Sequence, residues 1–318
     1  YEKQGLPSSE VTIAEVLQKR GYHTVHIGKW HLGTTKQYSP NNQGFDESLN
    51  MEGMLHLPED DPNVVNAKVD FDPIDRFLWA SAHFATSYNG GEKFAPGGYL
   101  ADYWTDQSLK VIEANRNRPF FLYLAHWGIH TPLQATRADY DAVGNIGSHR
   151  LRVYAAMIRS LDRSVGRIMA KLKKEGLDKN TLVVISSDNG GPGYVGLDGL
   201  NAPYRGGKIN FFEGGIRVPL FANWPARIPA GTRSDFPSGP RGGARAGAAA
   251  DYSILNGASF WSAGRFFFSK YFLRTAFAIG AATRPPSRLS PPVSPSTATA
   301  MAISGLSAGA KQMNQAML

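Results

Sequence analysis

Two side chains that could hold an anion follow a predicted strand near the start of the sequence. Lys29 and His31 stand on a turn directly after the β-type run 22–27, which breaks at Gly28. Lysine supplies a point charge and histidine a titratable donor, so the pair suits an oxyanion. A single pair of this kind is more often an ordinary surface lysine and a structural histidine. A binding site is indicated only if similar groups follow other strands of the chain.

The same arrangement recurs at two later strands. His126 and His130 follow one short apolar run, and Asp188 and Asn189 follow another. Ligands of open α/β sheets bind beyond the carboxyl ends of the strands, so parallel strands would bring these groups into one crevice. Lys208, in a glycine-rich loop further along, adds a second lysine. Carboxylate and amide oxygens suit Ca²⁺ or Mg²⁺ better than zinc.

The surrounding pattern predicts alternating helices and strands, which is typical of an α/β fold with a mostly parallel sheet flanked by helices. Thr12 and Glu15 have the spacing of a capping box at a helix start. Further helices are predicted at 99–116 and 151–175, and strands at 120–125, 182–187 and 220–223.

Residues 34–98 show scattered Pro, Gly, Asn and Asp without a sustained period, which predicts an irregular surface insertion. Its aromatic side chains could line a pocket, although we expect most to pack the insertion onto the body. They are Phe71, Phe77, Trp79, Phe84 and Tyr88.

The positive charge of the chain is concentrated in its tail. The 318 residues carry a net charge of +8, but residues 236–318 hold eight Lys and Arg against one acid, Asp251. The preceding part is therefore almost neutral, and we do not expect it to bind nucleic acid.

From about residue 238 the sequence becomes rich in Pro, Arg, Ala, Gly and Ser, which predicts a low-complexity, disordered or frame-shifted tail. The apolar run 252–282 is interrupted by Arg265, Lys270 and Arg274, so no transmembrane segment is predicted. The chain starts at Tyr1 without a signal-like segment, and we expect it to be a fragment.

The sequence excludes or gives little support to three common kinds of hydrolase site. There is no cysteine, which excludes a thiolate nucleophile among these residues. A zinc hydrolase using His126 and His130 would need a helix and a third ligand, but Pro132 and the preceding strand indicate a loop. A Ser-His-Asp hydrolase would need a G-x-S-x-G elbow, which does not occur.

Four motifs in order resemble the sulfatase family, the sulfuric ester hydrolases of the alkaline-phosphatase-like fold. They are GYHTVHIGKWHLG, AHWGIHTP, SSDNGG and RGGKINFFEGGIRVP, and the resemblance covers roughly residues 5–235. Ile209 stands where the family usually has glycine after the lysine.

The resemblance implies catalytic roles for four of these residues. Lys29 and His31 would hold the nucleophile and the sulfate. His130 and Lys208 would bind the sulfate and assist the leaving oxygen. The substrate would be a sulfate ester of a small molecule or glycan.

The resemblance also implies a metal and a modified nucleophile. Asp188 and Asn189 would be ligands of a Ca²⁺ or Mg²⁺ ion, with His126 and Arg217 in supporting roles. The nucleophile would be a formylglycine made from Cys or Ser in a C/S-x-P-x-R motif, and its hydrate would attack sulfur.

That nucleophile motif is absent from the 318 residues, as is the family's N-terminal strand with paired aspartates. We therefore expect residues 1–237 to be a partial, inactive catalytic domain with an incomplete sheet, and 238–318 to be an aberrant basic tail. Alternatives are a phosphate or phosphonate ester hydrolase of the same superfamily, or a non-catalytic binder of sulfated glycans. A periplasmic, secreted or lysosomal location would follow from the resemblance.

Overall fold

The computed structural model describes residues 5–234 and two short strands of the tail, 252–253 and 276–281. The helices are α1 (Ile13–Gln18), η1 (Lys36–Tyr38), η2 (Pro40–Asn42), α2 (Pro73–Ser81), α3 (Leu100–Ala114), α4 (Arg137–Val143), α5 (His149–Lys174), η3 (Asp178–Asn180), η4 (Gly193–Val195) and α6 (Glu213–Ile216). The strands are β1 (His23–Gly28), β2 (Glu47–Met51), β3 (Val64–Asn66), β4 (Thr86–Tyr88), β5 (Lys93–Phe94), β6 (Phe120–Ala125), β7 (Gln134–Thr136), β8 (Thr181–Ser186), β9 (Leu220–Asn223), β10 (Arg233–Ser234), β11 (Tyr252–Ser253) and β12 (Ala276–Ala281).

The main sheet has the strand order β10-β11-β9-β8-β12-β6-β1-β2-β4-β5. Strand β1 pairs in parallel with both β2 and β6, and β12 lies antiparallel between β6 and β8. Strands β6 and β8 therefore run in the same direction. The α/β class is confirmed, but the sheet is mixed rather than mostly parallel, because β2 with β4, β4 with β5 and β8 with β9 all pair antiparallel.

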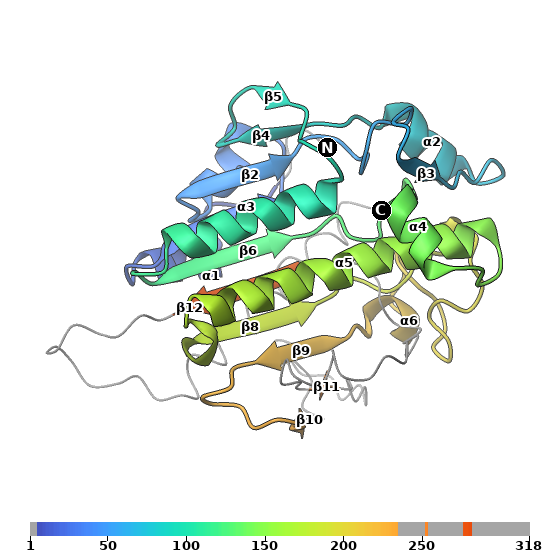
Figure 1. The fold of residues 1–318 in the computed structure, drawn as a ribbon. Coiled ribbons are helices and arrows are strands. Elements are labelled where there is room, and N and C mark those ends of the chain that lie inside the picture. Colours follow the sequence, from blue (N-terminus) through green and yellow to red (C-terminus); the bar gives the residue numbers. More distant parts are fainter. Residues whose placement is uncertain (1–4, 235–251, 254–275, 282–318) are drawn as a thin grey trace, which may run out of the picture.

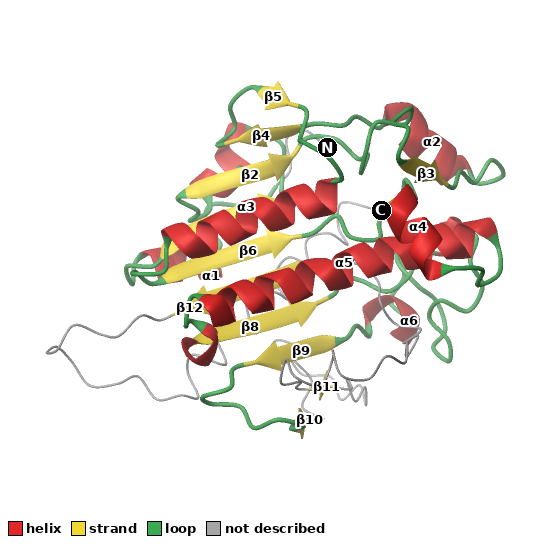
Figure 2. Ribbon diagram, viewed as in Figure 1, coloured by secondary structure: helices red, strands yellow, loops and turns green. Residues whose placement is uncertain are grey.

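Helices cover both faces of the central strands. Figures 1 and 2 show α3 and α5 side by side across the front of the sheet, and α1 packs on the other face. Strand β6 serves both sides, since Leu122 and Leu124 belong to the core under α3 and α5 whereas Phe121 packs with Phe45 near α1. Alternation of side chains along a strand produces these two apolar faces.

Ion pairs tie the helices of the front layer together. Arg163 of α5 lies 3.0 Å from Asp102 of α3 and 2.6 Å from Asp139 of α4. Because the Asp139 carboxylate is only 5% exposed, its pairing with arginine is needed to offset desolvation. The second pair of helix charges, Arg167 with Asp106, is more exposed.

The prediction of an irregular insertion at 34–98 was wrong. This segment contributes β2, β4 and β5 to the main sheet, β3 to a two-stranded sheet with β7, and helix α2. These elements are two to nine residues long, too short for a period to be recognised. Asp72 caps α2 by accepting from the N–H groups of Ile74 and Asp75.

The aromatic residues of this segment have different environments. Trp79 is buried and Phe84 packs against the main core, as expected. Phe71 and Phe77 are 74% and 68% exposed, so they do not pack the segment onto the body.

Within the part of the chain that the structure describes, no helix has the length and apolarity to cross a membrane. Of the basic tail, only β11 and β12 are described, and both join the main sheet. The predicted low-complexity region 285–317 lies outside the described residues.

Candidate active site

The turn after β1 places Lys29 above the end of β6. Gly28 has φ +111°, and a Cβ there would lie 2.1 Å from the carbonyl oxygen of Ala125, so only glycine fits. The Lys29 N–H donates to that same oxygen at 2.9 Å. The Lys29 ammonium then lies 5.1 Å from the centre of the Trp127 ring, a distance typical of cation–π contact.

The same tryptophan orients His130. The two rings stack with centroids 3.6 Å apart and an angle of 17°. His130 Nδ1 contacts the carbonyl oxygen of Thr131. A carbonyl can only accept, so Nδ1 carries the proton in the neutral ring. Nε2 then carries the lone pair that can accept a hydrogen bond, and it lies 3.5 Å from the ammonium of Lys208.

Lys208 is held between η4 and the loop that follows β8, residues 187–191 (the β8 loop). Its N–H donates to Gly191 at 3.1 Å, and its Nζ lies 6.0 Å from the centre of the Tyr194 ring. Desolvation lowers the pKa of Lys208 from 10.5 to about 8, although the nearby Asp188 carboxylate opposes the shift. A lysine with this pKa gives up its proton near neutral pH, which suits a catalytic acid.

The density of glycines around Lys208 lets backbone pack against backbone. A Cβ on Gly190 would lie 1.7 Å from the oxygen of Gly214, and one on Gly207 would lie 2.1 Å from the oxygen of Gly191. These glycines bring the loop after β8 and the loop that carries Lys208 into contact.

Asp188 completes the group of charges. Desolvation raises its pKa, and attraction by Lys29 and then Lys208 opposes the rise, so the carboxylate lies within electrostatic range of both ammonium groups. The Asp188 side chain is exposed to solvent. The desolvation therefore reflects protein atoms crowded around the loop rather than a carboxylate sealed from water.

The predicted metal ligands fit only part of a coordination shell. Asp188 offers a carboxylate, and Asn189 offers its amide oxygen while its Nδ2 donates to Gly190 at 2.9 Å. Ca²⁺ takes six to eight oxygens. No cluster of three or more His, Cys, Asp or Glu suited to a metal occurs among the residues described.

The remaining predicted residues differ in their placement. His31 is exposed, two residues beyond Lys29 on the same turn. His126 points away from the site into the α3–α5 layer, where its Nε2 lies 2.8 Å from the Ser164 hydroxyl. Burial lowers the pKa of His126 to about 3, so it is a neutral structural residue.

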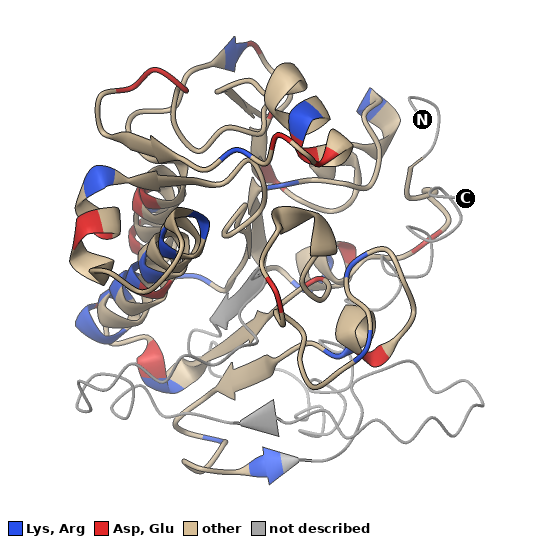
Figure 3. Ribbon diagram, turned by 90° about the vertical axis from the view of Figure 1, so that its right-hand side faces the viewer, with Lys and Arg blue, Asp and Glu red and all other residues tan. Residues whose placement is uncertain are grey.

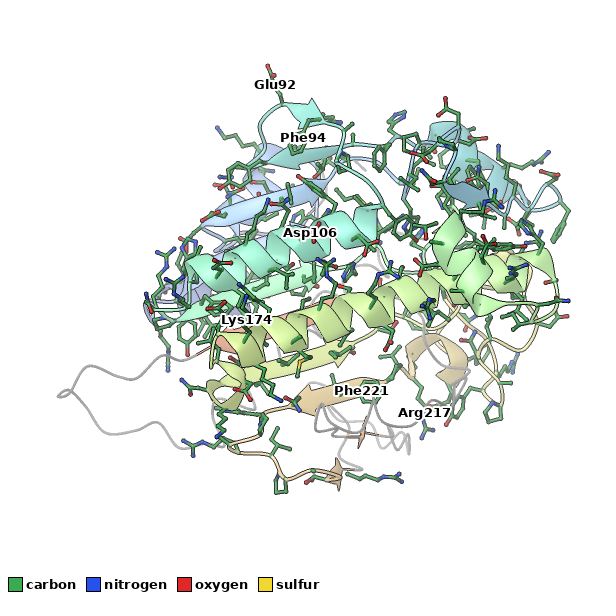
Figure 4. The ribbon with its side chains drawn as sticks, viewed as in Figure 1. Glu92, Phe94, Asp106, Lys174, Arg217 and Phe221 are labelled. Atoms are coloured by element: carbon green, nitrogen blue, oxygen red, sulfur yellow. The ribbon has the colours of Figure 1, made fainter. Side chains whose placement is uncertain are left out.

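Arg217 also has structural contacts. It pairs with Glu213 at 3.3 Å and lies 4.6 Å over the Tyr204 ring, close to the start of β9 (Figure 4). Sequence reasoning missed Trp127 and Tyr194, which contact Lys29, His130 and Lys208. The motif AHWGIH contains the signal for Trp127, an aromatic ring between two histidines beyond a strand.

Lys29, His130, Lys208 and Asp188 thus meet beyond the carboxyl ends of the strands. Figure 3 views the molecule with the ends of β6 and β8 towards the reader, and basic and acidic positions are interspersed there. Two lysines and an imidazole around one carboxylate can bind a tetrahedral oxyanion and, together with oxygen ligands, a cation.

The sulfatase family model matches residues 1–240. This chain belongs to the sulfatase family. It is 35% identical over 233 residues to N-acetylgalactosamine-6-sulfatase of Mus musculus, which covers 71% of this chain and 42% of that protein. Arylsulfatase J of Mus musculus is 32% identical, covering 71% and 36%. This sulfatase-family chain spans about two fifths of the length of these curated relatives.

Solved structures support the same assignment. The crystal structure of Ps i-CgsB in complex with k-i-k-neocarrahexaose is similar with a TM-score of 0.60 and 33% identity, covering 71% of this chain and 49% of that one. The PsFucS1 sulfatase from Pseudoalteromonas sp. has a TM-score of 0.51 and 25% identity, with coverage of 70% and 46%.

Proposed function

We propose that the protein to which these residues belong hydrolyses a sulfate ester, and that Lys29, His130 and Lys208 bind its sulfate group. One observation carries this proposal. Lys208 lies 3.5 Å from His130, and Trp127 holds both His130 and Lys29. The two ammonium groups are thereby positioned before any anion arrives, with His130 directing that of Lys208, and preorganised donors stabilise developing charge most effectively.

In this proposal the two lysines neutralise sulfate oxygens, and His31 binds from the Lys29 turn. The leaving oxygen needs a proton as the S–O bond breaks. Lys208, with a pKa of about 8, supplies it. His130 Nε2, which faces Lys208, accepts a hydrogen bond from that ammonium and keeps it directed.

Asp188 and Asn189 would contribute two oxygens to a Ca²⁺ or Mg²⁺ ion, whose chemistry there would be charge neutralisation of the sulfate. These two residues would supply only part of the ion's coordination shell. The nucleophile would be a formylglycine, whose C/S-x-P-x-R motif does not occur in the 318 residues.

We further propose a sulfated glycan as the substrate. The relatives include a protein named for N-acetylgalactosamine 6-sulfate and a crystal structure with bound neocarrahexaose. Both names refer to carbohydrate.

The test is hydrolysis of 4-nitrophenyl sulfate and of N-acetylgalactosamine 6-sulfate, in the presence of Ca²⁺, by the whole protein to which these residues belong. We expect sulfate release, and a loss of at least 10²-fold in kcat/KM on Lys208→Ala, as for removal of other charge-stabilising donors. Lys93→Ala, which removes a lysine 64% exposed and paired with Glu52, is the control.

Hydrolysis of 4-nitrophenyl phosphate in preference to the sulfate would support the phosphate ester alternative. Binding of sulfated oligosaccharide without any hydrolysis would overturn the enzymatic proposal and leave a glycan-binding role.

A further inference from the structure

The residue after Lys208 has a backbone conformation that its side chain disfavours. Ile209 has φ +82°, in the left-handed region, although it is β-branched. For such a residue this conformation is strained, and strain persists only where surrounding contacts impose it.

The loop supplies those contacts through Asn210. The Asn210 Oδ1 accepts from the N–H groups of Gly207 and Phe212, each at 3.3 Å. The Asn210 N–H donates to Gly207 at 3.2 Å, and the Lys208 N–H donates to Gly191. The Ile209 conformation is therefore fixed from both sides.

The strained residue is also exposed. Ile209 is 61% exposed, and Phe211 and Phe212 are 65% and 44% exposed. Exposed apolar side chains in succession cost solubility, and those adjoining a polar site indicate a contact surface. In contrast, the Lys208 side chain is half-buried and directed to His130 and Tyr194.

We propose that Ile209, with Phe211 beside it, contacts the carbon skeleton of the sulfate ester whose anionic group is bound by Lys208. The inference rests on the proposed function. In this proposal the sulfate binds innermost and the organic group extends outward past the exposed side of the Lys208 loop. An apolar surface at that place matches the C–H face of a ring that carries a sulfate, and it makes Ile209 a residue that determines specificity.

The test compares three ligands on the whole protein by calorimetry: inorganic sulfate, methyl sulfate and cyclohexyl sulfate. The last two have the same charge, and they differ in apolar area alone. We expect wild type to prefer cyclohexyl over methyl sulfate by about tenfold, which corresponds to partial burial of one aliphatic side chain.

Two substitutions isolate Ile209. Ile209→Gly removes the side chain, and Ile209→Asn keeps one that tolerates positive φ but is polar. Both should reduce the preference to about twofold or less while leaving the affinity for inorganic sulfate unchanged. Val11→Asn, at an apolar residue 66% exposed in the segment before α1, should change nothing.

A cyclohexyl preference that survives both substitutions would overturn the inference. Failure of the proposed function gives a different result, because Lys208→Ala would then leave the affinity for inorganic sulfate unaltered. Loss of both sulfate binding and preference in an Ile209 variant would mean that Ile209 only maintains the loop, which also contradicts contact with the substrate.

Discussion

Replacing Gly207 by alanine should move Lys208 away from the β8 loop. The new Cβ would lie 2.1 Å from the carbonyl oxygen of Gly191 and 2.7 Å from Nδ2 of Asn201. Ordinary contact begins near 3.4 Å. One of the two loops must therefore shift by about 1 Å, since backbone cannot rotate away as a flexible side chain can.

The expected cost follows from two contributions. Overpacking of this size costs about 1–3 kcal/mol. The shift also weakens the bond from the Lys208 N–H to Gly191, which contributes about 0.5–1.5 kcal/mol. We expect Gly207→Ala to lower the free energy of unfolding by about 2–4 kcal/mol, and a 1 Å displacement of Lys208 to reduce turnover by about 10²-fold.

Urea unfolding and the turnover of 4-nitrophenyl sulfate, measured on the same preparations, test the two effects. Gly193→Ala is the matched control, because a Cβ there meets no heavy atom within 4 Å and its φ lies outside the left-handed region. It should change stability by less than about 0.5 kcal/mol. Equal stability and equal turnover for the two variants would refute the role assigned to the backbone contact.

Three further predictions concern charge. Arg163→Ala should cost about 2–4 kcal/mol because it removes the closest partner of buried Asp139, whereas Arg167→Ala, at a more exposed pair, should cost less than about 1 kcal/mol in urea unfolding. Sulfate affinity should fall as pH rises through about 8, where Lys208 loses its charge, and Lys208→Arg should abolish that fall; an unchanged profile would contradict the lowered pKa. The free energy of unfolding should decrease as pH drops below 6.5, because unfolding lets three buried neutral histidines take up protons. The slope should be at most about 4 kcal/mol per pH unit. Urea midpoints at pH 7, 6 and 5 measure this decrease, and a flat profile would contradict the burial of the histidines. These histidines are His26, His56 and His126, with pKa values lowered by burial to about 4, 3 and 3.

Long periodic elements could be predicted from the sequence because their signal is local. The helix predicted at 151–175 and the strand predicted at 120–125 are present as α5 and β6, and the Thr12–Glu15 capping box is present at α1. The short elements of 34–98 could not be predicted, since strands of two to five residues are defined by their partners. The antiparallel direction of β9 likewise depends on pairing with β8, which no local pattern encodes.

For the site, the residue types after each strand were informative, but their orientation was not. In the structure Lys29, His130 and Asp188, which follow three strands, lie near Lys208 of the glycine-rich loop. His126 points into the core because it comes straight after β6, and Ser164 of α5 binds it there. Which of two histidines four residues apart faces the site depends on the loop that separates them.

The most direct test of the account is titration of inorganic sulfate into the whole protein and into Lys29→Ala, Lys208→Ala and Lys93→Ala variants. If Lys29 and Lys208 hold one anion, each of the first two substitutions should weaken binding by at least tenfold, whereas Lys93→Ala should have no effect. The tenfold value corresponds to about 1.4 kcal/mol for one charged hydrogen bond. Equal affinity in all three variants would contradict the central claim that these residues form a sulfate site.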